Sequence, residues 1–325
     1  KIARTVSAGQ FRMGIQKSKD WFLASGELQI DDSRVLNMRE LLELTAESSG
    51  KFIPLGQGRF LALTVEFRKR LDELRTFGEL SGDGVKMHPL TAPMLEELAA
   101  EVGACKTDKH WKTHIRRLGE ARDLKPKVPS TFQGELRDYQ VTGFEWMVRL
   151  AHWGVGACLA DDMGLGKTIQ ALAVILTRAA DGPTLVIAPT SVGANWIREA
   201  ARFAPTLNVI RFGDGDRKEV IESAGPFDLI VCTYGLLALE SEMLCQRSWE
   251  TIVLDEAQAI KNMATKRSKA AMELSGGFKL ITTGTPIENH LGELWNQFRF
   301  INPGLLGSIK SFNNRFAAPI ERDRD

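Results

Sequence analysis

The chain is poor in cysteine and has no long hydrophobic segment, and both shortages exclude whole classes of protein. Its four cysteines are widely spaced, unlike the close sets that build disulfide scaffolds or zinc sites. Two of them lie in apolar runs, so we expect buried free thiols in a reducing compartment. With no signal peptide and no apolar run that could span a bilayer, we expect a soluble intracellular protein without membrane partners.

Net charge is also nearly absent, because 42 Lys and Arg residues oppose 41 Asp and Glu residues. Residues 1–130 hold 22 basic against 18 acidic residues, and residues 131–325 hold 20 against 23. A strongly basic half would indicate nucleic-acid binding by itself. This balance does not, so a nucleic-acid role has to be argued from motifs.

The composition changes over residues 122–133, where Pro126 and Pro129 interrupt helix and strand patterns. We predict a linker there, which separates an N-terminal accessory domain, residues 1–125, from a second domain, residues 126–325.

The N-terminal domain is predicted to be a small α+β domain. Two stretches, WFLASGELQI around Ser25-Gly26 and KFIPLGQGRFLALT around residues 56–58, alternate like β-hairpins. Each precedes a helix-patterned stretch, VLNMRELLELTAES or VEFRKRLDELRTFGEL, which gives a ββα unit repeated twice. Two further helices are expected over residues 93–102 and 109–121.

The second domain alternates short apolar runs with helical segments. The runs GACLA, TLVIAP, DLIVCT, TIVLDE and KLITTG suit strands buried on both faces of a parallel sheet. Helices are expected near residues 137–152, 167–180, 192–203, 235–245 and 265–274. The predicted fold is therefore α/β with a doubly wound parallel sheet, which binds ligands at the carboxyl ends of its strands.

The stretch DDMGLGKT follows the first of these strands and opens a helix. Gly164 and Gly166 allow the tight turn in which backbone N–H groups converge on a phosphate, beside the positive end of the helix dipole. Lys167 is placed to reach the β and γ phosphates, and Thr168 to bind Mg²⁺. Asp161 departs from the strict pattern, because it stands where the first glycine belongs. A glycine turn followed by Lys-Thr by chance is the alternative.

The stretch TIVLDEAQ, about ninety residues later, reads as a strand that ends in two adjacent carboxylates. Asp255 and Glu256 project differently from a strand end, so one can hold Mg²⁺ while the other faces an attacking water. Polar residues that merely close a strand are the alternative, which the phosphate loop upstream disfavours.

Five motifs occur in the order of motifs Q, I, Ia, II and III of superfamily-two helicases: LRDYQ, DDMGLGKT, APTSVGANW, LDEAQAIKN and TGTPIEN. Over residues 132–320, including LGELWNQFRFINPGLLGS, the chain resembles the Swi/Snf family of DNA-dependent ATPases, which also accepts Asp at position 161. It departs from that family at Asp162, where Glu is usual, and at Gln258, where His is usual. The second departure concerns how motif II communicates with motif III.

The resemblance implies a RecA-like P-loop NTPase fold with ATP and Mg²⁺ as cofactors. Lys167, Asp255 and Glu256 would be catalytic, with Glu256 orienting or deprotonating the water. Thr168 and Asp255 would hold the metal. The implied nucleotide contacts are Arg137 and Gln140 at the adenine, and Asp162, Met163, Gly164, Leu165, Gly166, Lys167 and Thr168 in the loop.

Double-stranded DNA is the partner that the resemblance implies. Hydroxyl and backbone N–H groups suit phosphate contacts, which position a protein on DNA without reading its sequence. The implied DNA contacts are Thr190, Ser191, Asn195, Trp196, Thr233 and Tyr234. A helix N-cap is the alternative for Thr190-Ser191, and one residue can serve both purposes. The residues that would couple the nucleotide to the DNA are Gln258, Thr283, Gly284 and Thr285.

We therefore expect the N-terminal domain and first motor lobe of a larger ATPase that translocates along duplex DNA and remodels protein–DNA complexes, in the cytoplasm with the nucleoid or in the nucleus. Superfamily-two motors take catalytic arginines, worth about 10³ to 10⁵ in rate, from a second RecA-like lobe. Only 36 residues follow TGTPIEN, so little turnover is expected of this chain alone. An RNA helicase, a restriction-type motor subunit and a non-catalytic ATP-binding regulatory or interaction module are the alternatives.

Two further patterns lie before the linker. His110 and His114 are four residues apart on a predicted helix, a spacing that suits a metal, but no carboxylate or thiol supports them. The surrounding stretch KTDKHWKTHIRR suits a nucleic acid or a solvated helix face, and the solvated face is the simpler interpretation.

Overall fold

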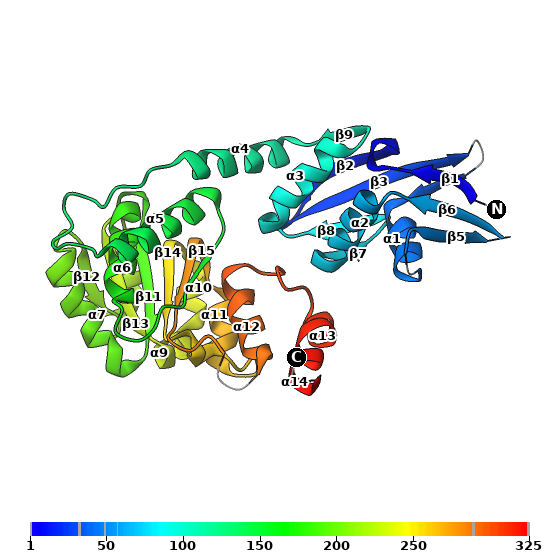
Figure 1. Cartoon of the computed structure of the whole chain (residues 1–325). Coiled ribbons are helices and arrows are strands. Elements are labelled where there is room, and N and C mark those ends of the chain that lie inside the picture. The colour runs from blue at the N-terminus through cyan, green and yellow to red at the C-terminus, as the bar shows by residue number, and fades with distance from the viewer. Residues whose placement is uncertain (1, 32–33, 49, 57, 288–289, 324–325) are drawn as a thin grey trace. The chain divides into compact units, whose positions relative to one another are not determined.

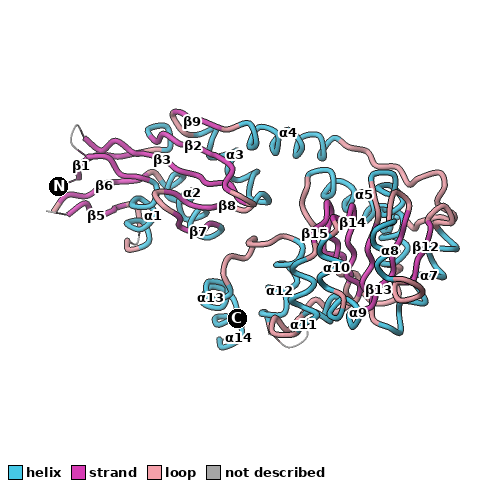
Figure 2. Tube along the Cα trace, turned by 180° about the vertical axis from the view of Figure 1, so that it is seen from behind, coloured by secondary structure: helices cyan, strands magenta, loops and turns pink. Residues whose placement is uncertain are grey.

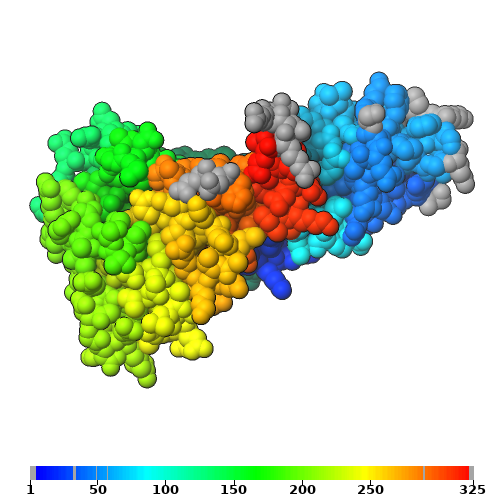
Figure 3. All heavy atoms as spheres, turned by 90° about the horizontal axis from the view of Figure 1, so that it is seen from below, coloured from blue at the N-terminus to red at the C-terminus, as the bar shows by residue number. Residues whose placement is uncertain are grey.

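The computed structural model describes the whole chain except residues 1, 32–33, 49, 57, 288–289 and 324–325, which are grey in Figures 1–3. It divides into two compact units, Lys1–Leu118 and Gly119–Asp325. None of the helices in the described part of the chain has the length and apolar character that crossing a bilayer requires.

The first unit is an α+β structure, as predicted. Its strands are β1 (Ile2–Val6), β2 (Phe11–Ser18), β3 (Trp21–Asp31), β4 (Arg34–Asn37), β5 (Phe52–Gly56), β6 (Arg59–Leu63), β7 (Gly78–Ser81), β8 (Gly84–Met87) and β9 (Ala104–Thr107). Its helices are α1 (Met38–Ala46), α2 (Val65–Phe77), α3 (Ala92–Glu101) and α4 (Lys109–Asp123), the last of which runs on into the second unit. The strand orders are β7-β8-β3-β2-β9, with β4 paired to β3, and β1-β6-β5.

One predicted hairpin of this unit is wrong. The stretch WFLASGELQI does not turn at Ser25-Gly26 but forms one continuous strand, β3, which pairs with β2 through a turn at Lys19 (φ 56°). Gly26 is needed for packing, because a Cβ there would lie 2.3 Å from Cζ of Phe11. A glycine inside a strand pattern marks such a close approach as well as a turn.

The second predicted hairpin is confirmed as β5 and β6, although Gln57 of its turn lies outside the described residues. The helix expected over VLNMRELLELTAES begins later than predicted. Its first residues form β4, and α1 starts at Met38 because the Asn37 side chain accepts a hydrogen bond from the N–H of Glu40.

The second unit contains the predicted doubly wound parallel sheet, of order β10-β15-β14-β11-β13-β12 (Figures 1 and 2). Its strands are β10 (Ala157–Leu159), β11 (Thr184–Ala188), β12 (Asn208–Arg211), β13 (Asp228–Thr233), β14 (Ser248–Asp255) and β15 (Ser275–Thr282). Alternate side chains of each central strand enter two separate cores, so both faces of the sheet are buried. The short edge strand β12 was not predicted.

Helices cover both faces of this sheet. The first core takes residues from α5 (Asp138–Trp153), α6 (Lys167–Arg178) and α7 (Thr190–Phe203). The second takes residues from α8 (Arg217–Ser223), α9 (Tyr234–Leu239), α10 (Ser241–Gln246), α11 (Lys266–Glu273) and α12 (Leu291–Ile301). The single helix predicted over residues 235–245 is thus two helices. The chain continues through α13 (Ile309–Phe312) to α14 (Ala318–Asp323).

Strand register brings the sequence motifs to one edge of the sheet. Leu159 of β10 and Asp255 of β14 are both paired with Thr282 of β15, which lies between them. The segments that follow these three strands therefore start at the same level, side by side.

The four cysteines are free thiols, as expected. Cys232 is buried and the other three are half-buried. Burial raises the pKa of Cys158 to about 11 and that of Cys232 to about 12, so both thiols stay protonated at neutral pH.

The first unit contains a buried histidine, His88, that makes its stability depend on pH. Burial, and then the nearby charge of His114, lowers the pKa of His88 to about 4. Below the unfolded-state pKa of about 6.5 the unfolded chain binds a proton that the folded unit does not. We therefore expect this unit to lose stability as the pH falls from about 6.5 to 4, by a total on the order of 3 kcal/mol.

Hydrogen exchange of β2 and β3 peptides, corrected for intrinsic rates at each pH, measures this loss. His88→Asn keeps an acceptor for the N–H of Leu90 but cannot titrate, so it is expected to flatten the pH dependence. The exposed His110 serves as the control through His110→Asn. Equal pH dependence in both variants would contradict the assignment.

Candidate functional site

The phosphate loop, residues 161–168, connects β10 to α6. Gly164 and Gly166 have φ values of +83° and +74°, a region in which other residues are strained. The Lys167 ammonium group donates to the main-chain carbonyls of Asp161, at 2.8 Å, and Asp162, at 3.0 Å. The loop and its lysine thus form one compact cradle at the start of α6.

Gln140 braces this loop from α5. Its Nε2 donates to the carbonyl of Leu165 at 3.0 Å, and its Oε1 accepts from the N–H of Arg137 at 2.9 Å. A Cβ on Gly166 would lie 2.5 Å from Nε2 of Gln140, so only glycine fits there. Adenine recognition by Arg137 and Gln140 stays a prediction, because their observed contacts are with the protein.

Asp161, which departs from the usual phosphate-loop pattern, is held by a buried neighbour. Nε2 of Gln170, on α6, donates to its carboxylate at 3.1 Å. The Asp161 side chain therefore has a hydrogen-bond partner within the lobe. Gln170 was not singled out from the sequence, although it lies three residues after Lys167 and on the buried face of α6.

The Asp255 carboxylate accepts three hydrogen bonds, and the residue is only 6% exposed. Its Oδ1 accepts from the hydroxyl of Thr282 at 2.5 Å and from the N–H of Glu256 at 3.0 Å. Its Oδ2 accepts from Nε1 of Trp196 at 2.7 Å. A carboxylate has about four lone-pair sites, so these three donors leave about one for a metal or a metal-bound water.

Two predicted DNA contacts point into the lobe instead. Trp196 is fully buried with its indole N–H on Asp255, and Tyr234 is buried with its hydroxyl donating to the Asp255 carbonyl at 2.9 Å. Burial raises the pKa of Tyr234. The Trp196 indole and the Tyr234 hydroxyl are therefore buried inside the lobe, where DNA cannot contact them, and the prediction of DNA contacts by these two groups is wrong. Trp196 lies on the buried face of α7 with Ala200, four residues later. This helical spacing of apolar residues indicates from the sequence that Trp196 faces the core.

Glu256 has an unusual backbone conformation. Its φ of 50° and ψ of 57° lie in the left-handed region, which a non-glycine residue seldom adopts. Such strain costs on the order of 1–3 kcal/mol and concentrates at functional sites.

Gln258 connects motif II to motif III. Its Nε2 donates to Oε2 of Glu256 at 2.8 Å, and its Oε1 accepts from the hydroxyl of Thr283 at 3.1 Å. The same hydroxyl accepts from the N–H of Thr285 at 3.2 Å. The four residues form one chain of contacts, so glutamine at this position joins the two motifs directly.

Gly284 brings motif III against the phosphate loop. A Cβ there would lie 2.8 Å from Cγ of Met163 and 3.9 Å from Nζ of Lys167. The predicted coupling residues therefore contact both the Glu256 carboxylate, through Gln258, and the phosphate loop, through Gly284. The next motif residues, Glu288 and Asn289, lie outside the described residues.

A groove of about 480 Å³ opens beside Glu256. It is lined by Pro189, Thr190, Tyr234, Gly235, Glu256, Gln258, Ala259 and Arg267. Sequence reasoning found most of this lining but missed the exposed Arg267, because nothing in the helical pattern of α11 marks it.

Of the remaining predicted DNA contacts, Thr190 lines this groove. Thr190 and Ser191 are exposed in the first turn of α7, and neither side chain caps that helix, so the N-cap alternative is wrong. Asn195 donates to Glu199 at 3.0 Å. The hydroxyl of Thr233 caps α9 by accepting from the N–H of Leu236 at 3.2 Å.

Two other places do not form functional sites. No cluster of metal ligands occurs in the part of the chain that the structure describes, and His114 contacts the Pro89 carbonyl at 3.0 Å.

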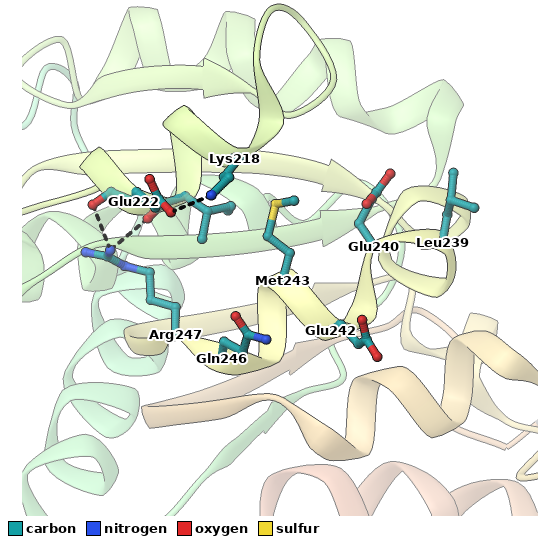
Figure 4. Close-up of a pocket in the computed structure, with 9 residues that line it drawn as sticks. Lys218, Glu222, Leu239, Glu240, Glu242, Met243, Gln246 and Arg247 are labelled. Carbon is teal, nitrogen blue, oxygen red and sulfur yellow. Dashed lines mark hydrogen bonds and ion pairs between the residues drawn. The ribbon is translucent and has the colours of Figure 1, made fainter.

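A second hollow, of about 530 Å³, lies at α8 and α10 (Figure 4). Several of its charged groups already have partners, since Lys218 lies 3.6 Å from Glu222 and Arg247 donates to main-chain carbonyls. We assign no function to it.

Comparison with known proteins agrees with this geometry. Residues 139–325 match the family model of the SNF2-related domain. YwqA of Bacillus subtilis, named as an inferred ATP-dependent helicase/translocase, is 45% identical over 225 residues, which are 67% of this chain and 24% of YwqA. The ISWI chromatin-remodeling complex ATPase CHR11 of Arabidopsis thaliana is 37% identical over 60% of this chain and 19% of its own length.

A solved structure gives the same result. The SWI2/SNF2 ATPase core of Sulfolobus solfataricus in complex with double-stranded DNA matches with a TM-score of 0.56 and 43% identity, over 61% of this chain and 42% of that one. The chain thus spans less than a quarter of the curated relatives described above. The RecA-like fold predicted for the second unit is confirmed.

The strained backbone of Glu256 leads to a prediction on stability. Asn tolerates the left-handed region better than Ala does, so we expect Glu256→Asn to be about 0.5–1 kcal/mol more stable than Glu256→Ala. In the middle of α5 the order should reverse, because Ala is the better helix former, so Glu145→Asn and Glu145→Ala are the control pair. Urea unfolding followed by tryptophan fluorescence measures both differences. The same order at both positions would contradict a strained Glu256.

Proposed function

Because the chain belongs to the SNF2-related domain family, we propose that it provides the nucleotide-binding lobe of an ATP-dependent motor that translocates along duplex DNA and remodels protein–DNA complexes. The observation that carries the proposal is the contact chain from Glu256 through Gln258 to Thr283. This chain runs beside the groove at Thr190, so it joins the place for hydrolysis to an exposed polar surface.

ATP and Mg²⁺ fit the residues of the phosphate loop and Asp255. The cradle at Gly166 admits no side chain, and Lys167 lies over the loop with its charge directed at the loop carbonyls. Thr168 and Asp255 offer the hard oxygen donors that Mg²⁺ prefers, and Asp255 keeps about one lone-pair site free. Mg²⁺ held there would neutralise charge that develops on the phosphates during transfer.

Glu256 is the residue that orients or deprotonates the attacking water. Its carboxylate is held by Gln258, whereas that of Asp255 is held by Thr282 and Trp196. Separating the two carboxylates lets one serve the metal and the other the water.

The groove beside Glu256 is the proposed path of one DNA strand. Thr190 and Ser191 offer exposed hydroxyls, and Arg267 adds a guanidinium group that suits a phosphate. Contacts of this kind carry no sequence information, as a motor that moves along any sequence requires. Such a motor acts where DNA is, in the nucleoid of the cytoplasm or in the nucleus.

A second RecA-like lobe of the full-length protein would provide the arginines for the γ phosphate. We propose this from the resemblance to two-lobed motors and from the small share of its relatives that the chain spans. The chain by itself should then bind nucleotide but turn it over at least about 10³-fold more slowly than the full-length protein.

The central test is ATP turnover by the full-length protein without nucleic acid and with duplex DNA, single-stranded DNA or RNA. We expect the greatest stimulation from duplex DNA, and a fall of at least about 10²-fold in Glu256→Gln because the water loses its base. Greater stimulation by RNA would favour an RNA helicase, and none by any nucleic acid would favour a non-catalytic module. Full DNA-stimulated turnover by the 325-residue chain alone would refute the second-lobe requirement.

The Trp196 contact leads to a prediction on the metal. Trp196→Phe removes one of three donors to Asp255, a hydrogen bond to a charged group worth about 1.5–3 kcal/mol. We expect about tenfold weaker binding of a fluorescent ATP analogue with Mg²⁺ and little change with EDTA.

Trp249→Phe is the matched control for this measurement. Trp249 is equally buried and its indole N–H donates to the Leu244 carbonyl at 3.0 Å, away from the site. If both variants lose Mg²⁺-dependent binding equally, Trp196 has a structural role only.

A further inference from the structure

The basic charge of the first unit is concentrated in one segment. Residues 1–103 hold 14 Lys and Arg against 15 Asp and Glu, whereas residues 104–118 hold five against one. The whole excess of the unit therefore lies in β9 and the first ten residues of α4.

These charges differ in their pairing from the arginines of α1 and α2. On α1 and α2 the arginines have acidic partners, such as Glu43 for Arg39 at 2.9 Å and Glu101 for Arg70 at 2.6 Å. Another set of exposed cations lacks such partners. Among the described residues, no carboxylate lies within ion-pair distance of Lys17, Lys106, Lys109, Lys112 or Arg117. Unpaired cations at one place raise the local positive potential, which paired ones do not.

Asp108 is the one acidic residue of residues 104–118. Its carboxylate forms hydrogen bonds with main-chain N–H groups rather than an ion pair with one of these cations. Its two carboxylate oxygens accept from the N–H groups of Lys17 and Trp111, each at 2.7 Å. The bond from Trp111 stabilises the first turn of α4, and the bond from Lys17 holds the end of β2 next to this turn. They also bring Lys17 near the helix, where Lys17 and Arg117 both help to lower the pKa of the half-buried His114, after burial itself.

The cations of α4 share one face of the helix. Lys109, Lys112 and Arg116 follow one another at spacings of three and four residues, and Arg117 lies next to Arg116 at the edge of this face. Trp111 and Leu118 lie on the opposite face and are buried. We call Lys109, Lys112, Arg116 and Arg117 the α4 basic stripe.

The stripe fits phosphate groups better than bases. Single-stranded nucleic acids are held by exposed aromatic rings on which bases stack, and Trp111, the aromatic residue of this segment, is 5% exposed. From Lys109 to Arg117 the helix rises about 12 Å, a length over which duplex DNA presents about seven phosphate charges. Cations spread over this length of one helix face match the backbone of a duplex.

We propose that the α4 basic stripe is a second, sequence-independent contact with duplex DNA, outside the motor lobe. The proposal rests on the proposed function, in which the motor acts on duplex DNA. It adds that the first unit itself grips the DNA backbone.

Affinity for a duplex, measured against salt concentration, tests the stripe. The variant Lys109→Gln/Lys112→Gln/Arg116→Gln/Arg117→Gln is compared with the unchanged 325-residue chain by fluorescence anisotropy. Each lost phosphate contact lowers the slope of log affinity against log salt by about 0.9, so we expect a slope smaller by about 3 to 4 and binding at least about tenfold weaker at 0.1 M salt. Nucleotide affinity and far-UV circular dichroism should stay unchanged.

A control variant with the same loss of charge is Arg39→Gln/Lys51→Gln/Lys69→Gln/Arg75→Gln, on the α1–α2 side of the same unit. An equal loss in both variants would reduce the effect to net charge and overturn the proposal. Unchanged binding by the stripe variant overturns it too, while leaving the proposed function intact. No duplex binding by the unchanged chain rejects both. Displacement of DNA by polyglutamate more readily than by unlabelled duplex would mark an acidic protein as the partner instead.

Discussion

The buried carboxylate of Asp255 is the interaction on which the arrangement of the lobe depends. Thr282 from β15 and Trp196 from α7 donate to this side chain, and Tyr234 from α9 donates to its carbonyl. A charge with so little access to water is stable only if it is fully hydrogen-bonded. Satisfying Asp255 therefore fixes elements on both faces of the sheet relative to one residue, and the parallel register sets the phosphate loop beside it.

The glutamine at position 258 gives the coupling a different chemistry from a histidine. An amide donates and accepts at once, so Gln258 can hold Glu256 and Thr283 together in a single state. An imidazole would have to choose a tautomer, and it gains a proton near pH 6.5. Gln258 has no proton to gain or lose, so its two bonds between motif II and motif III do not depend on its own titration.

The sequence predicted those parts of the structure that local chemistry determines. Continuous apolar runs identified five strands of the sheet, and glycine spacing identified the phosphate loop. Tertiary packing decided the rest: Gly26 lies in a strand against Phe11, and Trp196 and Tyr234 face inward although their motifs suggested a surface. Which polar group a buried ring reaches depends on residues far along the chain, such as Asp255, 59 positions after Trp196.

A motor of this kind must hold DNA and release it in the same cycle. The groove beside Glu256 suits a weak grip, because its lining contains hydroxyl and backbone groups with Arg267 as a basic side chain. Strong electrostatic binding in that groove would oppose each step, since every phosphate contact has to break when the strand moves. A row of exposed cations outside the lobe would remove this conflict, because the proposed α4 basic stripe could hold the duplex while the groove exchanges its contacts. The separation of charge between the two units would thus serve the proposed function, a motor that moves along DNA without reading its sequence.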